Sequence, residues 1–171
     1  MAEITWDLLI AADEAGIKLE IVNGLTTWET FPAARHQKAV YRIQQTIHRI
    51  EQSIKPGTND SSCGCYHYAD IYIRFPDGSF KRPDISVYCQ DLEDSDEATS
   101  EIPEAVIEVV SKGYEAKDAE PSRLFYLSQG VKDVIVYDPV TQAVSHTRRS
   151  GTKRLVSPVT ILLECGCQAI V

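Results

Sequence analysis

The hydrophobic pattern of the chain changes between a helical and a strand period. Apolar residues recur every three or four positions over 36–54, which predicts an amphipathic helix. Shorter helices are predicted over 6–14 and 118–129, the second begun by Asp118 and ended by Gly130. Runs rich in β-formers predict strands over 18–22, 25–28, 66–75, 80–89, 105–110 and 133–137.

The turns and the order of these segments indicate the fold class. Asn23-Gly24 predicts a tight hairpin at the N-terminus, and Pro76-Asp77-Gly78 predicts a second one. The run 105–110 is nearly all apolar, as in a central strand buried on both faces. We expect an α/β (α+β) protein with a mixed sheet flanked by helices and a C-terminal β extension of two or three edge strands.

The composition of the chain excludes several classes of protein. The 171 residues suit one domain, 1–171, and 43% are hydrophobic. We expect no membrane span, because no apolar run is long enough, and the start of the chain does not resemble a signal peptide. A cytoplasmic protein is expected. The net charge of -8 argues against coating nucleic acid by charge alone but allows an enzyme with a local basic rim.

Five cysteines include two Cys-x-Cys pairs, Cys63-Gly64-Cys65 and Cys165-Gly166-Cys167. An odd number of cysteines in a chain of this size does not indicate a disulfide framework. Two such pairs could bind one zinc ion, although CxxC spacing is more usual in structural zinc sites. We expect small buried thiols, with a zinc module as the alternative.

Two carboxylates interrupt apolar strands and are the main candidates for chemistry. Asp84 follows Arg82-Pro83, and Glu108 lies within Val106-Ile107-Glu108-Val109. If the two strands are neighbours, the carboxylates would repel each other unless a cation lies between them. Mg²⁺ or Mn²⁺ needs only one or two carboxylates with waters and phosphate oxygens, so the pair suggests phosphodiester hydrolysis.

The motifs around this pair resemble the Uma2 (DUF820) branch of the PD-(D/E)xK nuclease superfamily. The similarity spans nearly the whole chain and is carried by segments 19–24, 82–87, 103–111, 130–131 and 134–139, together with Tyr126. It implies a restriction-endonuclease-like core, a divalent-metal site and DNA cleavage.

The sequence departs from the superfamily at its lysine. The usual position two residues after Glu108 is Val110, and the later Uma2 position aligns with Ser122. We expect Lys117 to replace the missing catalytic lysine, with Lys112 and Arg123 as alternatives. A protein that has lost catalysis and binds nucleic acid or another protein is the competing hypothesis.

Two further residues are candidates on the same resemblance. Glu20 could be a third metal carboxylate or could form a salt bridge within its hairpin. His36 could belong to the site or be a satisfied core histidine. The expected substrate is DNA, and a homodimer would suit cleavage of both strands.

Overall fold

The computed structural model describes residues 6–29, 32–50, 63–111 and 119–171. Within these ranges the helices are α1 (Trp6–Glu14), α2 (Ala34–Gln44) and α3 (Ala119–Ser128). The strands are β1 (Lys18–Val22), β2 (Leu25–Glu29), β3 (His48–Arg49), β4 (Tyr66–Ala69), β5 (Ile73–Arg74), β6 (Phe80–Lys81), β7 (Ile85–Tyr88), β8 (Ala105–Val109), β9 (Asp133–Tyr137), β10 (Ala143–Arg148), β11 (Gly151–Val156), β12 (Thr160–Leu162) and β13 (Cys167–Ile170).

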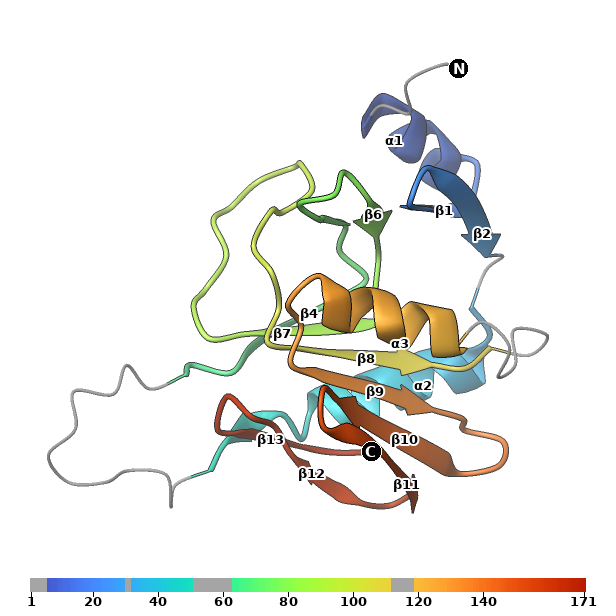
Figure 1. The fold of residues 1–171 in the computed structure, drawn as a ribbon. Coiled ribbons are helices and arrows are strands. Elements are labelled where there is room, and N and C mark those ends of the chain that lie inside the picture. The colour runs from blue at the N-terminus through green and yellow to red at the C-terminus, as the bar shows by residue number, and fades with distance from the viewer. Residues whose placement is uncertain (1–5, 30–31, 51–62, 112–118) are drawn as a thin grey trace, which may run out of the picture.

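A six-stranded mixed sheet is the centre of the fold, with the order β11-β10-β9-β8-β7-β4 (Figure 1). Its middle strand β8 runs parallel to β9 and antiparallel to β7. A four-stranded sheet, β2-β1-β6-β5, contains the N-terminal hairpin, and a three-stranded sheet, β12-β13-β3, contains the C-terminus. The expected α+β architecture is confirmed, but the C-terminal extension has four strands, β10 to β13, rather than two or three edge strands, and β10 lies inside the six-stranded sheet.

The central strands are apolar on both faces because a helix covers each face (Figure 1). Ile85, Ile107 and Ile135 pack with the α2 residues Val40 and Ile43 on one face. On the other face, Val106 and Val134 pack with Phe125 and Tyr126 of α3. Burying each such Val or Ile stabilises the fold by about 1.5–3 kcal/mol. This packing fixes the strand ends at which Asp84 and Glu108 lie.

The N-terminal hairpin forms as expected. Strand β1 pairs with β2 so that Val22 lies opposite Leu25. Asn23 and Gly24 have φ angles of 52° and 76°, the left-handed conformation that a two-residue hairpin requires at both positions.

Three sequence expectations about element length are wrong. The helix expected over 36–54 ends at Gln44, and His48–Arg49 form strand β3 against β13. The strand expected over 66–75 divides at Asp70, whose φ is 59°, into β4 and β5 of different sheets. Its partner over 80–89 likewise divides into β6 and β7. Pairing with distant strands therefore overrode the local periodicity.

The cysteine expectation is also wrong, because the structure contains two disulfides. Cys63 is bonded to Cys89, and Cys65 to Cys167. The remaining cysteine, Cys165, is a free thiol. Within the described ranges no helix is long and apolar enough to cross a membrane.

Candidate functional site

Strands β7 and β8 bring the two candidate carboxylates together. Ile85 lies opposite Ile107 in this antiparallel pair, so one further step of the register places Asp84 opposite Glu108. The backbone N–H of Asp84 donates to Oε2 of Glu108 at 3.2 Å. The two strands are therefore neighbours, which is the condition under which the sequence suggested a cation site between these carboxylates.

Asp84 is buried at the end of β7 and surrounded by donors. Its Oδ2 lies 3.1 Å from Nε2 of His36 and accepts the N–H of Val109 at 2.7 Å. Nζ of Lys18 lies 3.7 Å from its Oδ1. Burial alone would raise the pKa of Asp84, but His36, Lys18 and the Val109 N–H together lower it. Asp84 is therefore held as a carboxylate.

The pKa of Glu108 is shifted in the opposite direction from that of Asp84. Its Oε1 accepts a hydrogen bond from the hydroxyl of Tyr126 at 2.7 Å. Burial, and then repulsion from Asp84, raise the pKa of Glu108 from 4.5 to about 7. Two adjacent carboxyls with pKa values shifted in opposite directions form a site that a cation would stabilise.

A third charged group, Lys81, lies on the same side of the fold. Its Nζ donates to Oε2 of Glu20 at 3.0 Å and to Oγ of Ser122 at 3.1 Å, and it lies 5.0 Å from the centre of the Tyr126 ring. Burial lowers the pKa of Lys81, but Glu20 and Glu108 outweigh it and the net shift is upward. Lys81 therefore remains a buried ammonium although only 6% of it is exposed.

Glu20 holds this ammonium in place. Besides Lys81, it accepts the backbone N–H of Arg82 through Oε1 at 2.8 Å, so both of its oxygens are hydrogen-bonded. Burial opposes ionisation of Glu20, but Lys81, Lys18 and the Arg82 N–H lower its pKa. Glu20 is thus a carboxylate whose position is fixed by Lys81.

These groups line a cleft of about 700 Å³ between the N-terminal hairpin and α3. The exposed hairpin residues Leu25 and Trp28 form one side. The charged residues on its wall are Lys18, Glu20, Lys81, Asp84, Glu108 and Arg123. The cleft is large enough for part of a polymer and presents both carboxylates and cations to it.

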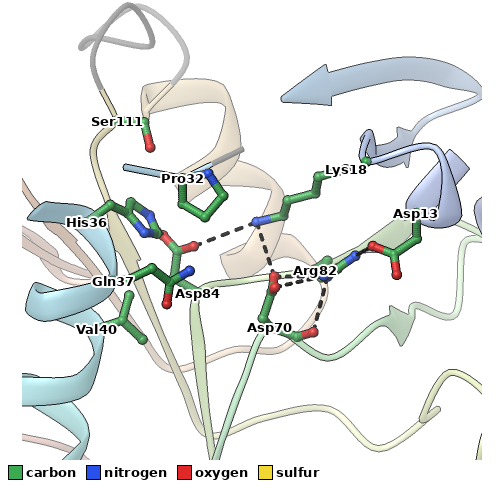
Figure 2. Close-up of a pocket in the computed structure, with 11 residues that line it drawn as sticks. Asp13, Lys18, Pro32, His36, Gln37, Val40, Asp70, Arg82, Asp84 and Ser111 are labelled. Atoms are coloured by element: carbon green, nitrogen blue, oxygen red, sulfur yellow. Dashed lines mark hydrogen bonds and ion pairs between the residues drawn. The ribbon is translucent and has the colours of Figure 1, made fainter. Parts of the chain in front are cut away.

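A smaller cavity of about 240 Å³ adjoins Asp84 on its other side (Figure 2). Lys18 lies there between Asp84 and Asp70, at 3.7 and 3.8 Å from their oxygens. Arg82 forms ion pairs with Asp70 and Asp13. No described arginine bridges Asp84 and Glu108.

The structure brings together the expected site residues that it describes. Asp84, Glu108, Glu20 and His36 converge. Arg123 reaches the cleft wall, where its Nη1 donates to Oγ of Ser145 at 3.1 Å. The other expected basic residues, Lys112 and Lys117, lie outside the described residues.

Sequence reasoning missed Lys81, Tyr126 as a partner of Glu108, and Lys18. Lys81 begins the segment Lys81-Arg82-Pro83-Asp84, whereas the family pattern places the basic residue after Glu108. Its Nζ contacts Ser122, the position at which the family resemblance places the lysine. The ammonium of Lys81 on strand β6 thus reaches the place at which the resemblance expects a lysine on helix α3.

Comparison with known proteins identifies the family. The model of Uma2, described as "Putative restriction endonuclease", matches residues 6–164. The chain is also similar to the crystal structure of "a putative nuclease belonging to DUF820" from Anabaena variabilis ATCC 29413, with a TM-score of 0.66. The two are 18% identical, and the match covers 93% of this chain and 88% of the other. No curated protein matches the sequence. The chain belongs to the Uma2 family.

Proposed function

We propose that this protein is a metal-dependent endonuclease that hydrolyses phosphodiester bonds in DNA at the Asp84–Glu108 cleft. This proposal is carried by the adjacency of the two residues on neighbouring strands, where the backbone N–H of Asp84 donates to the Glu108 carboxylate and the Lys81 ammonium lies on the same cleft wall. Membership of Uma2 supports a nuclease acting on nucleic acid.

The residues present suit a divalent cation of the Mg²⁺ or Mn²⁺ type. Such ions prefer carboxylate oxygens with open positions for water and phosphate. The raised pKa of Glu108 reflects burial and repulsion from Asp84, and a cation bound to both carboxylates would relieve both effects. Bound there, the metal would supply Lewis-acid stabilisation of the phosphate and an activated water.

The side chains of this protein would do the remaining work. Lys81 would donate to a non-bridging phosphate oxygen. An ammonium has three N–H groups, and among the described residues Glu20 and Ser122 accept two of them. A fixed positive charge in a buried site stabilises the negative charge that develops on phosphate without reorganising first. Tyr126 would orient Glu108 through its 2.7 Å hydrogen bond.

Two residues first expected near the metal take positioning roles in this proposal. Glu20 holds Lys81, and His36 holds Asp84 in its carboxylate form. Lys117 and Lys112 remain candidates for contacts with the substrate on sequence grounds alone. Arg123, on the cleft wall, would bind a phosphate away from the scissile bond.

The test is cleavage of supercoiled plasmid in Mg²⁺ or Mn²⁺. Wild-type protein should nick or linearise it, and Asp84→Ala and Glu108→Ala should each lose the activity. Asp96→Ala, which removes an exposed carboxylate outside the cleft, is the matched control and should cleave normally. Equal cleavage by all four proteins, or none by wild type in either metal, would reject the proposal. The second outcome would favour the binding-module hypothesis.

A further inference from the structure

All five cysteines of the chain meet in one place, although three separate segments carry them. Cys63 and Cys65 precede β4, Cys89 follows β7, and Cys165 and Cys167 lie at the start of β13. The sulfurs of Cys63, Cys65 and Cys167 all lie within 4.8 Å of one another, and so do those of Cys63, Cys89 and Cys165. Cys63 belongs to both groups and is the centre of the cluster.

One sulfur–sulfur distance in this cluster is close to that of a thiolate metal centre. With Zn–S bonds of about 2.3 Å, two sulfurs of a tetrahedral site lie roughly 3.8 Å apart. The sulfurs of Cys63 and Cys167 lie 3.6 Å apart. Cys63, Cys65 and Cys167 are all buried, as in structural sites closed to solvent. Each of the other four sulfurs lies within 4.8 Å of that of Cys63, so once the disulfides open, an ion bound to Cys63 would have the other thiols close by.

We propose that the reduced protein binds one Zn²⁺ through Cys63, Cys65 and Cys167, with the fourth position filled by Cys89 or Cys165. A small-molecule or protein thiol reductant gives the two disulfides four electrons and four protons, which yields four thiols. Binding Zn²⁺ by four thiols then releases four protons and leaves a site of net charge −2. Thiolate ligands favour zinc over Mg²⁺ or Mn²⁺.

The site would join two sheets through segments that are far apart in the sequence. It links the start of β4 and the end of β7, both in the six-stranded sheet, to β13 in the C-terminal sheet. In the oxidised chain the Cys65–Cys167 disulfide makes this link across 102 residues. The zinc site does not share ligands with the nuclease site, because Cys89 and Asp84 lie at opposite ends of β7, about 16 Å apart along a strand.

The experiment uses the full chain reduced with a phosphine that does not bind the metal. Folding is first checked by circular dichroism, and Co²⁺ and Zn²⁺ are then added separately. At least one Zn²⁺ per chain should remain after dialysis, and Co²⁺ should give the intense charge-transfer and visible bands of a tetrahedral thiolate site. The Asp84→Asn/Glu108→Gln protein, which lacks the carboxylate site, should retain one Zn²⁺ and give the same thiolate bands, because its cysteines are intact.

Variants then assign the ligands. Cys65→Ser and Cys167→Ser should each reduce retained zinc at least tenfold. The Cys89→Ser/Cys165→Ser double variant should lose the four-sulfur cobalt spectrum. The proposal is overturned if the reduced, folded wild type retains no zinc, since that result does not depend on any variant folding. It is also overturned if Cys65→Ser and Cys167→Ser bind zinc like wild type.

Discussion

Replacing Glu108 with glutamine should stabilise the protein in the absence of metal while abolishing metal binding. In the metal-free fold, burial and the neighbouring Asp84 penalise the charged form of Glu108. Glutamine has the same shape without the charge. Its oxygen can accept the Asp84 N–H, and its amide can donate to the Tyr126 hydroxyl, which turns to accept. Glu108→Gln therefore removes a cost and keeps both hydrogen bonds.

The size of the gain follows from the pKa of Glu108. A rise from 4.5 to about 7 in the folded state corresponds to roughly 3 kcal/mol, at about 1.36 kcal/mol per unit of pKa. When folding raises the pKa of a carboxyl, protonation of that carboxyl stabilises the native state. The stability of wild type should therefore fall as the pH rises from 4.5 to about 7 and should level off above that. The stability of Glu108→Gln should not fall over this pH range for this reason.

Urea unfolding in EDTA at pH 5 and pH 8 measures the difference. The variant should match wild type within about 1 kcal/mol at pH 5 and exceed it by up to about 3 kcal/mol at pH 8. Glu93→Gln, an exposed change of the same kind, should stay within about 0.5 kcal/mol at both values. A Glu108→Gln protein no more stable than wild type at pH 8 would refute the reasoning about this carboxyl.

Further predictions concern the ammonium, the metal and the core. Lys81→Met combined with Glu20→Gln removes a whole buried ion pair, and it should keep the fold but slow plasmid cleavage at least ~100-fold, whereas Glu20→Gln alone should slow it less. Mn²⁺ affinity measured by calorimetry should rise up to about tenfold per pH unit below pH 7, because Glu108 must lose its proton; a flat profile would exclude this linkage. Asp133→Asn should cost roughly 3 kcal/mol in urea unfolding, because buried Asp133 pairs with His146 and Arg148. A cost under ~0.5 kcal/mol would contradict that role.

The parts of the fold that sequence predicted are those governed by local chemistry. The Asn23-Gly24 turn, the strand 133–137 and the apolar strand beginning at Ala105 are encoded by turn residues and uninterrupted apolar runs. Long-range pairing determined the rest. Residues 48–49 continue a helical pattern but pair with β13, more than a hundred residues away. No local periodicity contains that information.

In the candidate site, too, some features follow from local sequence and others depend on tertiary structure. A carboxylate among apolar residues is conspicuous in any sequence, so Asp84 and Glu108 could be identified and their adjacency inferred from neighbouring strands. The position of Lys81 could not, because it depends on how β6 folds over the central sheet towards α3. The two disulfides depend likewise on tertiary contact between β4, β7 and β13.

Metal binding by the carboxylate pair tests the central claim most directly. Mn²⁺ should be titrated into wild type and into Asp84→Asn/Glu108→Gln at pH 8, with binding followed by calorimetry. Mn²⁺ prefers oxygen ligands, so the cysteine cluster should contribute little heat. We predict that wild type binds Mn²⁺ and that the double variant loses at least ~100-fold in affinity. Equal Mn²⁺ binding by the two proteins, or no binding by wild type, would contradict a metal site at Asp84 and Glu108.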